Sequence, residues 1–388
     1  MINNDKFNGK QLKTARLLRG LTLTELAKIT ELSKQSISLY ENCRNTPDYS
    51  KLCILSQKLN IPVEFFFHED TKEIHPDTTY FRSLASTTTR NRTSQIIKLE
   101  LVTKMYDALK EYIEFPKLNI PPVQFDVDDE FESPECIEKI SMQLRKYWNL
   151  GTEPIDNLQF TLESNGIVVT GFNTFENKID AFSQKISEEQ SDIFFIAVAI
   201  GERSESRIRF DMAHELGHIL LHPWSESIEL IPKEEFKLRE RQANMFASAF
   251  LLPKESFGKE VSIYPTNLRY YQDLKKKWKV SMQAMIYRAN QLGIITNSQF
   301  QYMIRQININ GWKKKEPYDN VYKLNDNLFQ GAISVLLENK VLDQNQILQL
   351  FYNHGIILER EDIENFLGLR KNSLLSEQSC KIIPLKLK

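Results

Sequence analysis

Short amphipathic segments separated by tight breaks make up the N-terminal part of the chain. Apolar residues recur at helical spacing in Gln11–Arg19. Thr22 and Glu25 have the spacing of a capping box, which opens a second helix. Lys34–Glu41 follows as a third helix after a tight turn. Two short helices joined in this way predict a helix-turn-helix, and we expect residues 8–67 to form an all-α domain.

The next segment, residues 68–132, is expected to connect this domain to the rest of the chain. Glu69–Thr79 is polar and reads as a linker. A one-sided apolar stripe then predicts a long helix from Arg90 to about Phe115. Residues 116–132 are rich in proline and acidic residues, which favours an extended connector.

Residues 133–260 mix helical and strand patterns. The expected helices and strands are Pro134–Trp148, Pro154–Ser164, Ile167–Thr170, Ile193–Ile200 and Ser206–Leu221. A small sheet beside a helix can hold an extended substrate strand along its edge. Residues 261–388 return to helical patterns. The fold class expected for the whole chain is therefore α+β, with an all-α N-terminal domain and a helical C-terminal region.

Composition narrows the location of the protein. The chain has 388 residues, 41% of them hydrophobic, and a formal net charge of −1. No apolar run reaches membrane-spanning length, and the N-terminus lacks the apolar core of a signal peptide. The four cysteines are scattered along the chain, which indicates reduced thiols rather than a disulfide framework. We therefore expect a cytoplasmic protein with no membrane partner.

Charge is unevenly distributed along the chain. Residues 1–60 contain ten Lys or Arg and five Asp or Glu, a local net charge of +5. A local excess of this sign suits the phosphate backbone of DNA.

The stretch Asp211–His222 carries the candidate chemistry. It contains His214-Glu215-Leu216-Gly217-His218, which matches the H-E-x-x-H pattern. Residues four apart lie on one face of a helix, so the two histidines can bind one metal ion. Glu215 can then act as the base that takes a proton from an attacking water.

This pattern also occurs by chance, so a third ligand matters. A second apolar helix, Glu240–Pro253, begins with a carboxylate that can complete a His-His-Glu zinc site. Asn244, one turn later, can orient a ligand. The alternative is that Glu240 is a solvated glutamate in the first turn. His222 lies eight residues after His214, about 12 Å along a continuing helix, so we interpret it as a cap or lid residue.

The N-terminal domain resembles the XRE, or lambda-repressor-like, family of DNA-binding domains. The residues that carry the resemblance are Leu26-Ala27, Ser33–Asn42, Pro47 and Leu59–Pro62. The resemblance implies a double-stranded DNA operator, and such domains read two half-sites as dimers, which implies a homodimer. Lys34, Gln35 and Ser38 would meet base edges, and Arg44 and Asn45 would lie near phosphates. The alternative is a protein-docking module that has lost DNA binding.

A second resemblance covers the candidate metal site. Its motifs are Phe81–Leu84, Pro154-Ile155, Asp180–Ser183, Arg209–His218 and Glu240–Pro253, and together they resemble the ImmA/IrrE family of zinc metallopeptidases. The resemblance implies a zincin-like domain that binds Zn²⁺ through His214, His218 and Glu240, with Glu215 as the base. It also implies a protein substrate of the repressor type.

Two functional classes remain open. In the first, the chain is a DNA-binding regulator with an active zinc endopeptidase domain. In the second, it is a non-catalytic transcription regulator whose peptidase-like fold senses metal or binds a partner. The presence of Glu215 favours the first class.

Overall fold

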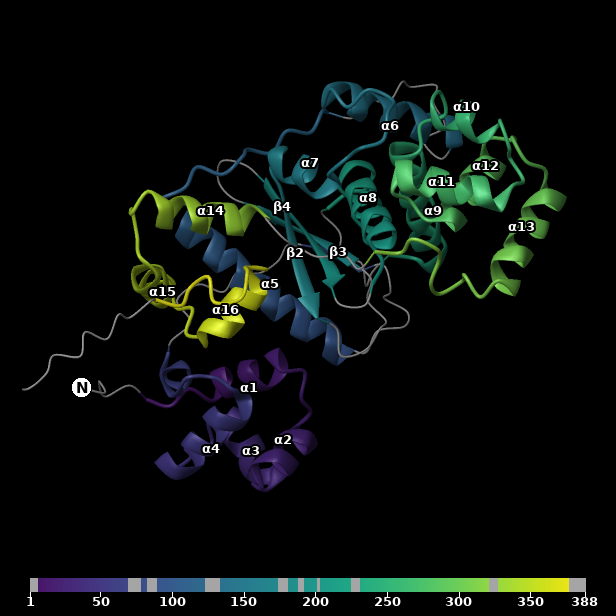
Figure 1. The fold of residues 1–388 in the computed structure, drawn as a ribbon. Coiled ribbons are helices and arrows are strands. Elements are labelled where there is room, and N and C mark those ends of the chain that lie inside the picture. The colour runs from purple at the N-terminus through teal and green to yellow at the C-terminus, as the bar shows by residue number, and fades with distance from the viewer. Residues whose placement is uncertain are drawn as a thin grey trace, which may run out of the picture. The chain divides into compact units, whose positions relative to one another are not determined.

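The computed structural model in Figure 1 describes residues 6–68, 78–81, 89–122, 133–173, 181–187, 192–200, 203–224, 231–320 and 327–376. The chain forms two compact units. One comprises residues 1–74, 88–114 and 329–388, and the other comprises residues 75–87 and 115–328.

The first unit contains the helix-turn-helix. Its N-terminal elements are α1 (Gly9–Leu18), α2 (Leu23–Thr30), α3 (Lys34–Glu41), α4 (Tyr49–Leu59) and the 3-10 helix η1 (Val63–Phe67). The capping box of Thr22 and Glu25 is present at the start of α2. Helix α3 has the bounds expected from the sequence. A buried ion pair ties α1 to α3, because the Arg16 guanidinium donates to both carboxylate oxygens of Glu41 at 2.6 and 2.8 Å.

Four further helices belong to this unit. They are α5 (Thr89–Leu109), α14 (Leu328–Glu338), α15 (Gln344–Asn353) and α16 (Arg360–Phe366). The Ser94 hydroxyl on α5 donates to the Leu18 carbonyl at 2.8 Å, and Arg19 pairs with Asp362 of α16. Helix α5 ends before Phe115, the end expected from the sequence. Helices from distant parts of the sequence thus pack in one unit with the helix-turn-helix.

The second unit is built on a four-stranded mixed sheet. Its strands are β1 (Thr78–Phe81), β2 (Ile167–Asn173), β3 (Ala181–Ser187) and β4 (Asp192–Ile200), in the order β1-β3-β4-β2. β2 runs parallel to β4, and β3 is antiparallel to both β1 and β4. Residues 193–199 of β4 are apolar and buried throughout, as expected of a central strand covered on both faces.

The second unit also contains a set of helices. They are α6 (Pro134–Tyr147), α7 (Leu158–Ser164), α8 (Glu205–Leu221), α9 (Lys233–Leu251), α10 (Phe257–Val261), α11 (Leu268–Trp278), α12 (Met282–Gln291) and α13 (Asn297–Ile309). Helix α8 contacts β3, β4 and α9 (Figure 1). The expectation that α7 starts at Pro154 is wrong. The Arg209 guanidinium binds the carbonyl oxygens of Ile155 and Asp156, and Asn157 caps the helix by accepting from the Phe160 N–H.

The α+β fold class is confirmed. None of the helices in the described part of the chain combines the length and apolar character needed to cross a bilayer. Several expected features lie outside the described residues: most of the linker 69–79, residues 82–84, residues 123–132 of the connector, Asp180 and the tail from residue 377. The role of the sheet in holding a substrate strand stays a prediction.

Candidate metal centre and nucleic-acid interface

A close approach of α8 and α9 creates the candidate metal centre. A Cβ atom added at Gly217 would lie 3.1 Å from both the Ala243 Cα and a ring carbon of Phe246. Small residues at this crossing let the two backbones come together. The last two turns of α8 therefore lie against the middle of α9, and this position brings Glu240 to the histidines.

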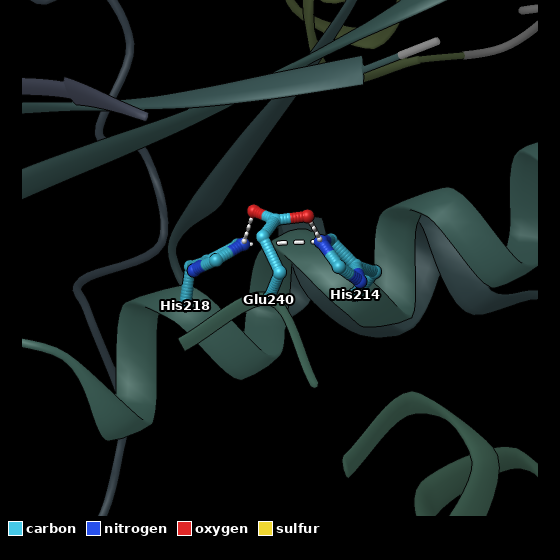
Figure 2. Close-up of side chains that lie close together, drawn as sticks. All are labelled: His214, His218 and Glu240. Atoms are coloured by element: carbon cyan, nitrogen blue, oxygen red, sulfur yellow. Dashed lines mark hydrogen bonds and ion pairs between the residues drawn. The ribbon is translucent and has the colours of Figure 1, made fainter. Parts of the chain in front are cut away.

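Three side chains converge at this crossing (Figure 2). The Nε2 atoms of His214 and His218 are 3.0 Å apart. One Glu240 carboxylate oxygen lies 3.2 Å from His218 Nε2, and the other lies 3.6 Å from His214 Nε2. Both histidines are buried, and the Glu240 side chain is 18% exposed. The sequence-predicted ligands thus lie together in the structure.

The alternative reading of Glu240 as a solvated first-turn residue is wrong. Helix α9 begins at Lys233, so Glu240 lies in its interior rather than at its start. Burial would raise the pKa of this carboxyl, but hydrogen bonds and charge from His214 and His218 outweigh it and hold the pKa at about 2. The carboxylate is therefore ionised, as a metal ligand must be.

Further side chains contact the two imidazole rings at their Nδ1 atoms, on the side away from Glu240. The Asn244 side-chain oxygen lies 3.2 Å from His214 Nδ1, and the Asn244 amide donates to the Glu240 carbonyl at 2.8 Å. His222 Nδ1 lies 2.9 Å from His218 Nδ1. On its other side, His222 Nε2 lies 3.1 Å from the Gln242 side-chain oxygen. The Nδ1 atoms are thus engaged by the protein, while both Nε2 atoms face Glu240.

The sequence reasoning placed His222 correctly at the end of α8 but missed its contact with His218. His222 is the C-cap residue of α8 and is buried. Burial, followed by charge on His218, lowers the pKa of His222 to about 3, so its ring is neutral. The spacing of four residues from His218 is the signal that could have indicated this contact. No sequence signal pointed to Gln242.

Glu215 is fully buried and has a hydrogen-bond partner on the sheet. The Ser183 hydroxyl of β3 donates to one of its carboxylate oxygens at 2.5 Å. Ser183 lies in the motif Asp180–Ser183, yet no pattern in that motif indicated a contact with Glu215. The hydrogen bond fixes the orientation of the only carboxylate within the H-E-x-x-H pattern.

The geometry of the three converging side chains fits a tetrahedral metal. Zinc binds histidine nitrogen and carboxylate oxygen at about 2.0–2.2 Å, which places two ligand atoms of a tetrahedron about 3.3–3.5 Å apart. The two Nε2 atoms are 3.0 Å apart, and each has a different Glu240 carboxylate oxygen near it, at 3.2 Å from His218 and 3.6 Å from His214. One ligand atom from each of the three residues lies within 4.8 Å of the other two. Among the residues that the structure describes, His214, His218 and Glu240 form the group with metal-ligating geometry. The donor set and its spacing therefore fit zinc with one coordination position open.

The helix-turn-helix presents the polar residues singled out from the sequence. Lys34 and Gln35, at the start of α3, are exposed, and Ser38 is half-buried on the next turn. Arg44 and Asn45 are exposed in the loop after the helix. Ile37 and Tyr40 point into the core and fix the rotation of α3. The side chains expected to contact DNA therefore stay available to a ligand.

The domain with the candidate metal centre and the helix-turn-helix domain each match a known protein family. Residues 163–290 match the family model of the IrrE N-terminal-like domain. Residues 12–66 match a helix-turn-helix model. Both resemblances noted from the sequence are thus confirmed, and the chain joins a helix-turn-helix DNA-binding domain to an IrrE-like domain with a metallopeptidase-like fold. The family match and the His-His-Glu geometry together indicate a metal site in the IrrE-like domain.

Two curated relatives match part of the chain. An uncharacterized HTH-type transcriptional regulator of Rickettsia conorii is 26% identical over 89 residues, which are 22% of this chain and 71% of the relative. An uncharacterized HTH-type transcriptional regulator of Rickettsia prowazekii is 25% identical over 89 residues, which are 22% of this chain and 68% of that protein. These relatives and the two domain matches support a transcription regulator that carries a peptidase-like domain.

Proposed function

We propose that the protein is a DNA-binding transcription regulator whose IrrE-like domain is a zinc-dependent endopeptidase. The observation that carries the proposal is the convergence of His214, His218 and Glu240 beside an intact Glu215. A fold that serves only as a scaffold has no need for two buried imidazoles aimed at one carboxylate.

Each residue has a distinct role in this proposal. His214, His218 and Glu240 would hold the zinc ion. When bound, zinc would lower the pKa of a water and polarise the substrate carbonyl. Glu215 would take a proton from the attacking water and pass it to the leaving amine. Ser183 would keep the Glu215 carboxylate in one orientation through its hydrogen bond.

The helix-turn-helix would bring this activity to an operator. Lys34, Gln35 and Ser38 would read base edges in the major groove, and Arg44 and Asn45 would contact phosphates. Binding to two half-sites would require a homodimer. The substrate would be a repressor-type regulator, as the resemblance to the ImmA/IrrE family implies, and the protein would act in the cytoplasm.

A matched pair of variants tests the peptidase proposal. Glu215→Gln removes the base but keeps the shape of the side chain, so zinc content should stay at about one per chain. His214→Ala should lose both zinc and activity. Protein N-termini are then compared by mass spectrometry in cells that carry the wild type or Glu215→Gln. We expect at least one new N-terminus, in a regulator, with the wild type alone.

The same experiment separates the two functional classes. If zinc-loaded wild type and Glu215→Gln give identical N-termini under every stress applied, the endopeptidase proposal fails. A loss of transcriptional regulation in His214→Ala but not in Glu215→Gln would then identify the domain as a metal sensor.

A further inference from the structure

A pocket of about 320 Å³ opens on the same helix face as the candidate metal centre. Arg207 and Asp211 line it from α8, and they precede His214 by seven and three residues. Steps of four, three and four residues lead from Arg207 through Asp211 and His214 to His218, so all four lie on one face of α8. At 1.5 Å per residue, Asp211 and Arg207 lie about 4.5 and about 10.5 Å along the helix axis from His214.

Two of the carboxylates around this pocket, Glu316 and Asp319, already form ion pairs and hydrogen bonds within the fold. The Lys275 ammonium, which is 4% exposed, lies 2.8 Å from a Glu316 carboxylate oxygen and also pairs with Asp319. Glu316 further accepts from the backbone N–H groups of Met282 and Gln283 at 2.8 and 3.1 Å. Asp319 accepts from the Glu316 N–H at 2.8 Å. These carboxylates hold the start of α12 in place and do not offer free negative charge to a ligand.

Among the described residues, the cations at the pocket have no carboxylate partner. Arg207, Lys313 and Lys314 line the pocket and are exposed. Within the described parts of the chain, none of these three side chains forms an ion pair. Asp211 is 2% exposed and has interactions of its own. The charge that faces solvent in this pocket is therefore positive, with the half-buried Trp312 beside it.

We propose that this pocket receives an acidic side chain of the peptide substrate. An extended peptide advances about 3.3 Å per residue, so a side chain that enters the pocket between Asp211 and Arg207 would lie about one to three residues from the bond cleaved at the metal. The inference rests on the endopeptidase function proposed above and adds the class of peptide that the site selects. Arg207, Lys313 and Lys314 supply the selection, since a carboxylate gains their attraction and a lysine or arginine side chain is repelled.

A degenerate peptide library tests the proposal. Full-length, zinc-loaded protein is incubated with the library, and mass spectrometry reports the residues around each cleaved bond. We expect Asp and Glu to be enriched about fivefold or more at one fixed position within three residues of that bond. The variant Lys313→Glu/Lys314→Glu should lose this enrichment and select Lys or Arg at the same position.

Lys315 provides the matched control. It is exposed and adjacent in the sequence, but it does not line the pocket. Lys315→Glu changes the net charge in the same direction and should keep the acidic preference. Zinc content and circular dichroism confirm that each variant is folded.

The possible results separate the two proposals. Cleavage without an acidic preference overturns the pocket assignment and leaves the endopeptidase function standing. An equal change in preference from Lys315→Glu also overturns it, because the effect would then come from general surface charge. A wild type that cleaves no peptide in the library counts against the endopeptidase function and the pocket assignment together.

Discussion

The Nδ1 atom of His218 lies 2.9 Å from the Nδ1 atom of His222, and this contact determines where the protons on both rings lie. The Gln242 side-chain oxygen, 3.1 Å from His222 Nε2, can only accept, so His222 Nε2 carries the proton and donates this hydrogen bond. A neutral His222 ring then has an accepting Nδ1, so His218 donates from its own Nδ1. His218 Nε2 is left as a lone pair directed at the metal position, which is the form that zinc binds.

We therefore predict that His222→Ala weakens zinc binding although His222 is not a ligand. The loss of a hydrogen bond to a ligating histidine typically lowers metal affinity by about 10- to 100-fold. Competition against a chromophoric chelator measures the affinity directly. Gln242 acts on the metal only through His222, so adding Gln242→Ala to His222→Ala should cost little more.

Asn244→Ala serves as the comparison, since Asn244 contacts the other histidine, His214. Its effect should add to that of His222→Ala. An unchanged zinc affinity in His222→Ala would contradict the argument on proton positions.

A second prediction concerns the hydrogen bond from Ser183 to Glu215. Ser183→Ala removes the donor that orients the base. A hydrogen bond to a charged group typically contributes about 1.5–3 kcal/mol, so peptide cleavage should fall by about 10- to 150-fold. Zinc content should not change, since Ser183 is not among the converging ligands. Steady-state cleavage of a library peptide provides the measurement. Ser183→Thr keeps the hydroxyl and should restore most of the rate; a rate as low as that of the alanine variant would exclude the orienting role.

Local signals explain why parts of this molecule were predictable. Helix α3 has its predicted bounds because Ser33 caps it and its apolar residues repeat clearly. His214 and His218 needed only the periodicity of one helix. The pairing with Glu240 needed two helices to cross, and the small residues Gly217 and Ala243 make that crossing possible.

Other parts were not predictable because their structure depends on distant contacts. The first turns of α9 have no apolar repeat and are joined by ion pairs such as Arg239 with Glu235, so the helix begins at Lys233, well before the expected Glu240. The C-terminal helices gave no sign that they pack around the helix-turn-helix. The ion pair of Arg19 with Asp362 joins residues from opposite ends of the sequence.

A third prediction concerns sequence reading by α3. Gln35 is exposed on its first turn, where a glutamine side chain suits adenine. Gln35→Ala should cost about 1–3 kcal/mol on the preferred operator and little on random DNA. Binding to a randomised DNA library followed by sequencing identifies the operator and the shift in preference. Lys58→Ala, an exposed change outside α3, should keep the preference. Equal weakening by Gln35→Ala on all sequences would show that Gln35 does not read bases.

The last prediction concerns pH and a buried glutamate. Glu163 on α7 is 5% exposed, and burial raises its pKa from 4.5 to about 8, although the Gln159 side chain and a backbone N–H hydrogen-bond to it. The folded protein therefore holds a proton that the unfolded chain releases above about pH 4.5. The contribution of this proton to the free energy of unfolding is fully present below about pH 4.5. It is lost as the pH rises toward 8, by up to about 1.4 kcal/mol per pH unit.

Glu163→Gln removes this titration and keeps the size of the side chain. We expect the melting temperature of the IrrE-like domain to fall less between pH 5 and pH 8 in the variant than in the wild type. Calorimetry of both proteins in zinc-saturated buffer measures the difference, and any pH dependence of metal binding is common to the two. Glu135→Gln, an exposed change on α6, should behave as the wild type. A parallel pH dependence in wild type and Glu163→Gln would mean that Glu163 is already ionised in the folded protein near neutral pH, with a cation or water supplying the solvation that burial removes.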